Sequence, residues 1–273
     1  MININKMEIR LANKETGPIS TRINDTDILK NIILNFWHKK EYFFPAPQPV
    51  SLERRDLTNL INNEYYVCPK SDGMRFLMLC YDDKTYMIDR AFKFYQVNQK
   101  FNNKLLYIGG TENNVGGIFD GELVKNKKDE WQYVIHDCIS IMGQEILYDN
   151  FPKRYEKIEQ FVKSWKEGDF VIKKKDFFDL SNIKLLNNQI NENLLDHNTD
   201  GLIFTPKNKK IGSGTQYDLY KWKPRKLHTF DFKIIIDENN KNIPGKIAAY
   251  VNNAGKHELY ASCPAVILLK QFF

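Results

Sequence analysis

The sequence predicts an α+β fold made of antiparallel sheets with flanking helices, and three observations lead to it. Short runs of β-branched and aromatic residues fill the middle of the chain, with turn signals between them. A few segments show apolar residues at helical spacing instead. No internal repeat or low-complexity linker divides the 273 residues, which suffice for one large domain and a small appendage.

Three segments are expected to form helices. The first is residues 24–40, which Asn24 or Asp25 can cap, with an apolar side made of Ile28, Ile32, Leu34 and Phe36. The second is residues 150–169, with Pro152 near its start, Gly168 near its end, and apolar residues at Ile158, Phe161, Val162 and Trp165. The third is "IKLLNNQINENLL", residues 183–195.

The strand candidates come mostly in pairs. Two runs, residues 64–81 and 84–97, flank the turn signal "DDK", and residues 116–124 and 130–142 flank "KNKKD". Further strands are expected in residues 200–206, 216–224, 228–237 and 245–253, with a domain boundary near residues 224–228. Ahead of the strands, Pro45, Pro47 and Pro49 exclude regular helix and favour an extended segment.

Composition excludes several classes of protein. Lys and Arg outnumber Asp and Glu by 40 to 34, a net charge of +6 that tolerates a polyanionic ligand without requiring one. The cysteines Cys68, Cys80, Cys138 and Cys263 form no C-x-x-C pair, which disfavours a zinc site or a disulfide framework and fits a reducing compartment. A secretory signal and a membrane-spanning run are both missing from the sequence, so an intracellular protein without a membrane partner is expected.

Charged residues recur where the expected strands end. Taken singly, lysines in K-x-K usually belong to a solvated strand face, and Asp-Gly pairs usually mark turns. Their order along the chain is more specific than any one of them. The series is Lys70, Asp72 and Arg75 in "KSDGMR", Arg90 in "MIDRAF", Asp120 and Glu122 in "FDGELV", Lys175 in "KKKDFF", Asp200 in "TDGLIF", and Lys221 and Lys223 in "YKWKP".

These segments resemble, in identity and order, the motifs of the covalent nucleotidyltransferases, which comprise mRNA capping guanylyltransferases and polynucleotide ligases. "KSDGMR" is similar to the family's K-x-D-G-x-R, in which the lysine is the nucleophile. The lead-in "PQPVSLERRDLTNL" and the run "DLYKWKPRKLHTFDFKI" resemble capping enzymes more than ligases. The resemblance implies a ligase-type, ATP-grasp-like nucleotidyltransferase domain over residues 1–226 and a partial OB-fold over residues 227–273.

By this resemblance Lys70 attacks GTP to form a lysyl-GMP intermediate, and GMP then passes to the 5′-diphosphate end of RNA as the mRNA cap. Arg75, Lys221 and Lys223 are expected to assist catalysis by disfavouring the ammonium form of Lys70 and by offsetting phosphate charge. The expected GTP-binding residues are Arg90, Glu122, His136, Lys175 and Asp200. Glu122 and Asp200 are also expected to hold Mg²⁺ or Mn²⁺, and Gly73 to let the backbone turn beside Lys70.

Two departures from the family pattern are visible. His136 occupies the position where the family usually has an aromatic residue that stacks on guanine, although an imidazole can also stack. The R-x-D-K motif of the family's OB domain is missing from this sequence, which predicts GTP binding with slow self-labelling compared with a chain extended through a complete OB domain.

Other readings stay open. The alternatives to a guanylyltransferase are an ATP-dependent polynucleotide ligase and a degenerate, non-catalytic module that binds RNA 5′ ends or nucleotides. For a capping enzyme, triphosphatase and methyltransferase domains or subunits are expected partners. The source is then a eukaryote or a large DNA virus, and the location the nucleus or, for a virus, the host cytoplasm, the viral factory or the virion.

Overall fold

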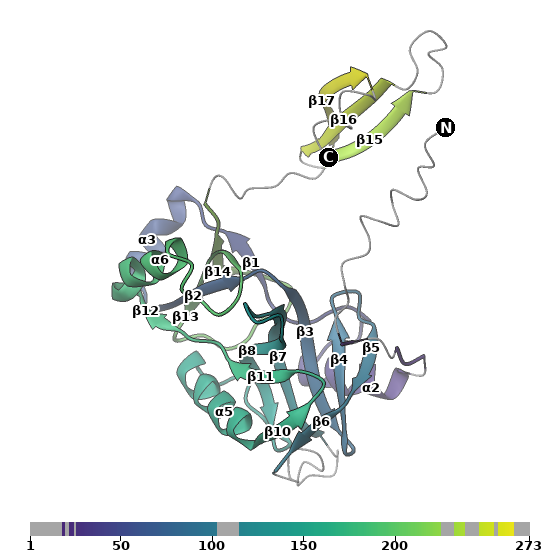
Figure 1. Cartoon of the computed structure of the whole chain (residues 1–273), viewed down its shortest axis with the longest axis vertical. Coiled ribbons are helices and arrows are strands. Elements are labelled where there is room, and N and C mark those ends of the chain that lie inside the picture. Colours follow the sequence, from purple (N-terminus) through teal and green to yellow (C-terminus); the bar gives the residue numbers. More distant parts are fainter. Residues whose placement is uncertain are drawn as a thin grey trace. The chain divides into compact units, whose positions relative to one another are not determined.

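The computed structural model describes residues 18, 19, 22–24, 26–102, 115–224, 232–237, 246–253 and 256–264, the last three ranges as backbone. The chain divides into two compact units, residues 1–223 and 224–273 (Figure 1). Two sheets dominate the first unit. In the described residues, no helix is long and apolar enough to cross a membrane.

The larger sheet of the first unit has seven strands. Its order is β11 (Val171–Lys174), β8 (Trp131–Ile141), β7 (Val115–Lys125), β3 (Met74–Tyr81), β4 (Lys84–Asp89) and β5 (Phe94–Val97), with β9 (Gln144–Glu145) also paired to β8. Both expected hairpins are present as β3–β4 and β7–β8. Asp82 and Asp83, with φ of 49° and 57°, make the tight turn between β3 and β4.

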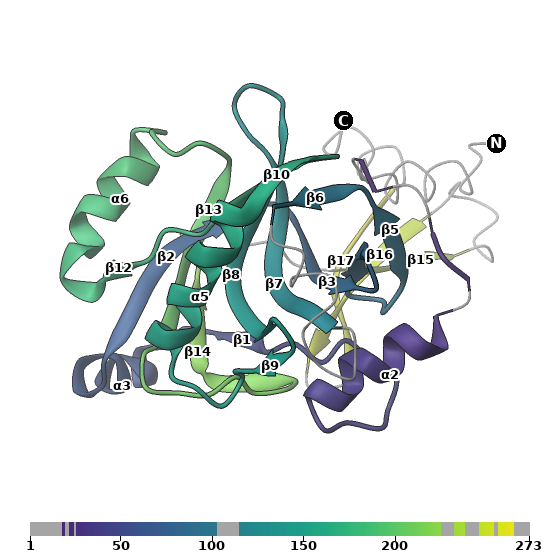
Figure 2. The same cartoon turned by 90° about the horizontal axis from the view of Figure 1, so that it is seen from below.

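Helices cover both faces of this sheet. Side chains alternate along a strand, so Phe76 and Met78 of β3 face one side while Leu77 and Leu79 face the other. The first face packs against α5 (Phe151–Ser164), and the second packs against α2 (Asp27–Phe36) (Figure 2).

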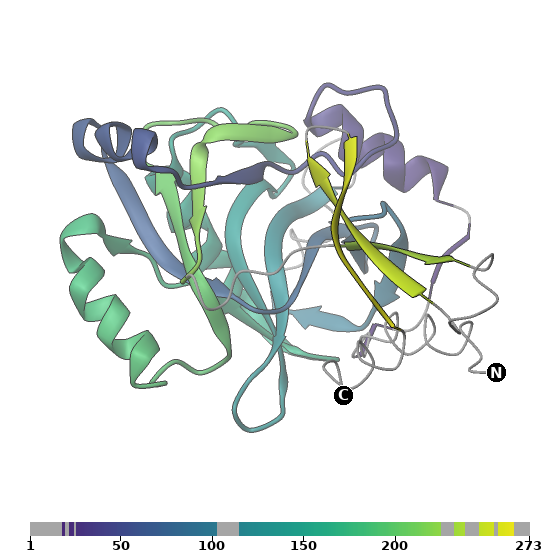
Figure 3. The ribbon, with the colours of Figure 1, turned by 90° about the horizontal axis from the view of Figure 1, so that it is seen from above.

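The smaller sheet has five strands in the order β1 (Gln48–Ser51), β14 (Thr215–Trp222), β13 (Thr199–Pro206), β2 (Tyr65–Ser71) and β12 (Phe178–Asp179). Two helices, α3 (Leu57–Asn62) and α6 (Ile183–Asn191), cover its outer face (Figure 3). Short 3₁₀ turns at Arg54–Asp56 and Leu180–Asn182 lead into these helices. A two-stranded ribbon pairs β6 (Gln99–Phe101) with β10 (Trp165–Gly168).

The chain passes from the smaller to the larger sheet between β2 and β3, at Asp72 and Gly73. A β-carbon on Gly73 would collide with the carbonyl oxygen of Leu123 and the side chain of Val124. Glycine is therefore required here by the close approach of β7, rather than by the turning freedom that the sequence suggested.

Helices α2, α5 and α6 lie inside the three expected segments, but details of the first differ. Its N-cap is Thr26, not Asn24 or Asp25, of which Asp25 lies outside the described residues. Leu29, Ile33 and Leu34 are its buried residues, while the expected core residue Ile28 is 67% exposed. The apolar residues of this segment are nearly continuous, so spacing alone did not select the buried face.

The end of α5 was also predicted wrongly. Asn150 caps its start and accepts a hydrogen bond from the Lys153 backbone, as expected for a segment with Pro152 in the first turn. The helix ends at Ser164, however, and Trp165 is already the first residue of β10. Gly168 therefore belongs to a strand, where a side chain would collide with Gln99.

The α+β class with antiparallel sheets and flanking helices is confirmed, with two exceptions. β1 pairs with β14, and β11 with β8, in parallel. In the second unit, β15 (Phe232–Asp237), β16 (Lys246–Asn253) and β17 (Lys256–Pro264) form an antiparallel sheet. The predicted boundary between residues 226 and 227 lies outside the described residues, and the partial OB-fold stays a prediction.

Candidate active site

A cavity of about 230 Å³ opens between the two sheets, and both sheets supply its walls. Most of the predicted site residues line it, namely Lys70, Arg75, Arg90, Glu122, His136, Lys175 and Lys221. The remaining two, Asp200 and Lys223, join this group through ion pairs. The structure therefore brings together residues that are up to 153 positions apart in the sequence, as the separation of Lys70 and Lys223 illustrates.

Lys70 reaches the cavity because of strand periodicity. Tyr65 and Val67 of β2 pack outward beneath α3 and α6, so Cys68 and Lys70 face the other side. The Lys70 ammonium donates to Asp200 Oδ1 over 2.7 Å, and its side chain keeps 24% of its exposure. The candidate nucleophile is thus held by a carboxylate yet open to the cavity.

Asp200 faces Lys70 because β13 carries an irregularity. The register with β2 shifts between Thr199 and Leu202, so one extra residue of β13 opposes β2. Leu202 and Phe204 point outward, and without this bulge Asp200 would do the same. Gly201, at φ +154°, sits in the bulge, where a β-carbon would collide with the Trp222 carbonyl.

Asp200 accepts from two lysines. Lys223 Nζ lies 2.5 Å from Oδ2, opposite the contact with Lys70. Burial opposes ionisation of Asp200, but the hydrogen bonds from Lys223 and Lys70 outweigh it and lower its pKa. For Lys221, burial and the charges of its neighbours, Lys70 first, lower the pKa. This wall of the site therefore holds two lysines paired with Asp200, and Lys221 lies within reach of their charges.

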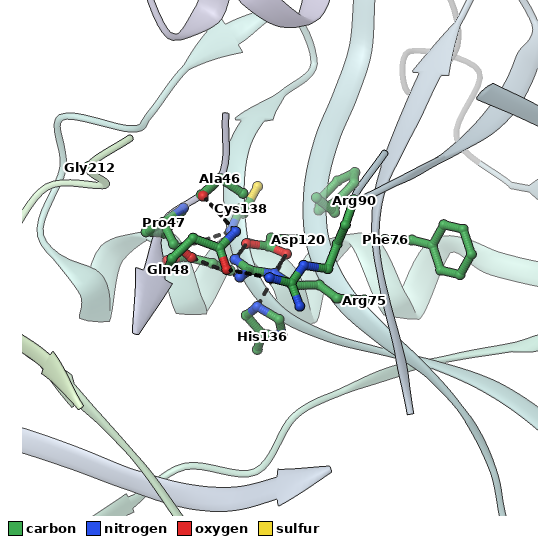
Figure 4. Close-up of polar contacts among 12 residues, drawn as sticks. Ala46, Pro47, Gln48, Arg75, Phe76, Arg90, Asp120, His136, Cys138 and Gly212 are labelled. Atoms are coloured by element: carbon green, nitrogen blue, oxygen red, sulfur yellow. Dashed lines mark hydrogen bonds and ion pairs between the residues drawn. The ribbon is translucent and has the colours of Figure 1, made fainter. Parts of the chain in front are cut away.

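The opposite wall is built on β7, β3 and β8, and its centre is Asp120 (Figure 4). Arg75 donates from Nε to Oδ1 over 2.9 Å and from Nη2 to Oδ2 over 2.5 Å, while its Nη1 donates to the Pro47 carbonyl over 2.8 Å. His136 Nε2 lies 3.3 Å from Asp120 Oδ1. Burial disfavours the charge on Asp120, but Arg75 and His136 overcome it and hold its pKa well below the ordinary value.

Glu122 lies beside this cluster. It is two residues after Asp120 on β7 and directly opposite Arg75 in the β3–β7 register. Burial raises the pKa of Glu122, although the nearby charges of His136, Arg75, Lys70 and Lys175 partly oppose the shift. A buried carboxylate with a raised pKa is suited to receive a cation or a hydroxyl donor.

Two further predicted residues occupy different settings. Arg90 lies at the exposed rim and donates from Nη2 to Gln48 Oε1 over 3.3 Å (Figure 4). Lys175, in contrast, is buried just after β11 and donates to the Ser71 hydroxyl. Burial lowers the pKa of Lys175.

Sequence reasoning did not assign roles to Asp120, Ser71, His197 or Gln48. Ser71 follows the assigned residue Lys70 directly, and Asp120 is two positions before the assigned residue Glu122. Because side chains alternate along a strand, Asp120 could have been placed on the same face as Glu122. His197 contacts Ser71 Oγ through Nε2 at 2.7 Å. Nothing in its local sequence signals that contact, because it depends on how β13 approaches β2.

The donor set for a metal is small. In the described residues, no group of three or more His, Cys, Asp or Glu side chains is arranged to hold an ion. Mg²⁺ in nucleotide sites is commonly held by one or two carboxylates together with substrate phosphates and water. Glu122 and Asp200 fit that mode of binding, in which the nucleotide brings most of the ligands.

A lysine at a strand end, facing a cavity whose walls carry further lysines and arginines, is the arrangement expected of a covalent nucleotidyltransferase. The family model described as "mRNA capping enzyme, catalytic domain" matches residues 15–225. The chain belongs to the mRNA capping enzyme family.

Its relatives carry the same description. The "mRNA-capping enzyme subunit alpha" of Schizosaccharomyces pombe is 31% identical over 242 residues, which cover 78% of this chain and 59% of the relative. The protein of that name from Candida glabrata is 32% identical over 267 residues, covering 85% and 58%. The chain thus spans a little over half the length of these relatives.

Among solved structures, the ligase domain of M. tuberculosis LigD aligns over 82% of this chain and 73% of its own, with a TM-score of 0.43 and 10% identity.

Proposed function

We propose that this chain is an mRNA guanylyltransferase that works through a covalent lysine intermediate. The Lys70 amine attacks the α-phosphorus of GTP, a P–N bond forms, and the bond to the β-phosphate oxygen breaks to release pyrophosphate. A terminal phosphate oxygen of a 5′-diphosphate RNA then attacks the same phosphorus and displaces Lys70. The product carries GMP through a 5′–5′ triphosphate bridge.

The observation that carries the proposal is the Lys70–Asp200–Lys223 cluster at the cavity. Asp200 fixes the Lys70 side chain at the entrance to the site before substrate arrives. Lys221 and Lys223 add positive charge on the same wall, where charge develops on the α-phosphate and on departing pyrophosphate. The Lys70 amine attacks in its neutral form, so a proton must leave Nζ before the P–N bond forms.

The other wall is suited to the nucleoside. Arg75 donates three of its five N–H groups to Asp120 and Pro47, and the others can donate to a ligand. We extend the proposal to a divalent ion, Mg²⁺ or Mn²⁺, which would be held by Glu122 or Asp200 and would supply Lewis-acid stabilisation of the triphosphate.

Labelling with α-³²P nucleotides tests the proposal. The protein is incubated with labelled GTP or labelled ATP and a divalent metal, then denatured, and the adduct is counted. A GTP-specific, acid-labile and alkali-stable adduct is expected. Equal or stronger labelling by ATP would favour the ligase alternative, and binding without any adduct would favour the non-catalytic module.

The 5′ end of the RNA that accepts GMP indicates which other capping activities must work beside this chain. The names of the fungal relatives contain "subunit alpha", which supports the proposal that this chain works beside another component of a capping apparatus. With pre-formed lysyl-GMP protein, transfer to 5′-diphosphate RNA and none to 5′-triphosphate RNA is expected. That result would place the removal of the γ-phosphate on a separate triphosphatase. Transfer to both RNAs would contradict it.

A further inference from the structure

Three side chains form a hydrogen-bonded chain behind the candidate nucleophile. Lys175 Nζ contacts the hydroxyl of Ser71, the residue that follows Lys70, and Ser71 Oγ lies 2.7 Å from His197 Nε2. Lys175 and Ser71 are each 6% exposed. The three residues come from the end of β11, the end of β2 and the approach to β13, so the chain links the two sheets.

One direction of each hydrogen bond is compatible with all the donors present. A lysine ammonium can only donate, so Ser71 Oγ accepts from Lys175. The hydroxyl proton can then point at His197, whose Nε2 accepts it when the ring is neutral and carries its proton on Nδ1. Burial and the positive charge of Lys175 lower the pKa of His197 to about 4, with Lys173 adding to the shift and Asp196 opposing it.

We propose that His197 is a positioning residue, which orients the Ser71 hydroxyl so that its oxygen is presented to Lys175 and the Lys175 ammonium is held toward the nucleotide cavity. The backbone on which Lys175 stands is already fixed, because its N–H donates to the Ile135 carbonyl and its carbonyl accepts from Tyr155. The four-carbon side chain of Lys175 can still rotate about its own bonds. The hydrogen bond to Ser71 Oγ holds the Lys175 ammonium in place, and the contact with His197 holds the Ser71 hydroxyl. This role rests on the proposed function, since it is exerted on nucleotide binding.

Two substitutions separate the acceptor from the ring. His197→Phe keeps a ring of similar size and removes the acceptor, whereas His197→Gln replaces the ring and can return a carbonyl oxygen near the place of Nε2. The efficiency of GTP labelling, the rate divided by the half-saturating GTP concentration, is expected to fall about tenfold in His197→Phe. It is expected to stay within about threefold of wild type in His197→Gln.

Ser71→Ala completes a double-mutant cycle. If His197 acts through Ser71, the double variant Ser71→Ala/His197→Phe loses no more than the larger single loss. Losses that multiply would overturn the proposal, as would a His197→Phe variant that labels like wild type or a His197→Gln variant as impaired as His197→Phe. Urea unfolding of each variant shows whether a loss comes from damage to the fold.

A second measurement does not depend on catalysis. In ¹⁵N-histidine-labelled protein, long-range ¹H–¹⁵N spectra report which ring nitrogen is protonated, and the His197→Gln spectrum identifies the His197 signals among the five histidines. We expect an unprotonated Nε2 near neutral pH, with a shift that changes in Ser71→Ala. A protonated Nε2 would overturn the proposal whatever the labelling shows. If that tautomer is found but GTP forms no adduct, the proposed function fails and the hydrogen-bonded chain stands.

Discussion

The two walls of the cavity hold their charges in different ways. On the lysine wall, Lys70 and Lys223 share Asp200 through one contact each and keep 24% and 30% of their side-chain exposure. On the arginine wall, Arg75 grips Asp120 with two hydrogen bonds, and these side chains keep only 14% and 1%. The ion pairs of the lysine wall are partly exposed, and each lysine makes one contact with Asp200. The ion pair of the arginine wall is buried, and Arg75 binds Asp120 in a bidentate way.

This difference follows from the chemistry of the two cations. A lysine ammonium is a flexible point charge whose pKa responds to burial and to neighbouring charge, which suits a group that must lose a proton and react. A guanidinium stays charged and fits a carboxylate with two parallel hydrogen bonds, which suits a group that holds position. We therefore expect substitutions on the lysine wall to damage activity first, and those on the arginine wall to damage stability as well.

Removing the proposed nucleophile should have the largest effect on activity. Lys70→Ala is expected to abolish the GMP adduct, because no amine remains to form the P–N bond. The fold should stay near wild type, since Lys70 is partly exposed and fills no apolar core. Adduct formation and urea unfolding are measured on the same samples. Lys70→Arg, which keeps a positive charge beside Asp200, is the matched control and should also form no adduct. A persistent adduct in either variant would defeat the assignment.

On the arginine wall, Asp120→Asn should cost stability. Removing one partner of a buried ion pair typically costs about 3–5 kcal/mol, because the other charge is left without compensation. The pKa of Asp120 is lowered in the folded state, so its contribution to stability is present above its unfolded pKa and is lost as pH falls. The difference between Asp120→Asn and wild type should therefore shrink in acid.

The control for Asp120 is Glu159→Gln, which removes an exposed carboxylate paired with Lys163 and Lys174. Solvent screens such pairs, and little change in unfolding is expected. Denaturant midpoints near neutral and acidic pH measure both variants. Equal losses in the two would remove the distinction between buried and exposed pairs on which the comparison of the walls depends.

On the lysine wall, Asp200→Asn should lower activity more than stability. The neutral amide no longer holds the two ammonium groups of Lys70 and Lys223, and the nucleophile loses its fixed position. We expect labelling to fall about a hundredfold, in line with the cost of misplacing a reacting group. Single-turnover adduct formation measures this effect. If Asp200→Asn lost more stability than Asp120→Asn, the lysine wall and not the arginine wall would be the one that stabilises the fold.

Much of the fold was predictable because it depends on local pattern. Short runs of β-type residues on both sides of "DDK" and "KNKKD" predicted two hairpins, and these supply β3, β4, β7 and β8 of the larger sheet. The parallel pairing of β1 with β14 was not predictable in this way, because Gln48–Ser51 has a partner more than 160 residues away. Local patterns carry no information on such a partner.

The resemblance predicted which residues gather at the candidate site, but not how they are connected. Lys70, Lys221 and Glu122 were placed in one site by resemblance, and the structure brings them to one cavity. The route by which Asp200 reaches Lys70 depends on a bulge in β13, and the contact of Ser71 with His197 depends on the approach of two strands. A sequence shows neither feature, because both arise from how strands meet.

The smallest expected effect tests a residue between the walls. Burial raises the pKa of Glu122 in the folded state, so folding favours its protonated form. By linkage, the stability associated with Glu122 is present below its unfolded pKa and is lost as pH rises through its folded pKa, the reverse of Asp120. Near neutral pH the charged Glu122 therefore destabilises the protein.

Glu122→Gln keeps the shape without the charge, and we expect it to be about 0.5–1 kcal/mol more stable than wild type near neutral pH, with the gain disappearing in acid. Its GTP labelling should nevertheless fall, because an amide is a poorer ligand for a metal ion or a ribose hydroxyl. Urea unfolding at both pH values, together with single-turnover labelling, measures the two effects. A variant that is less stable near neutral pH would mean that the pairing of Glu122 with Arg75 across β3 and β7 outweighs its burial, and that Glu122 belongs to the arginine wall.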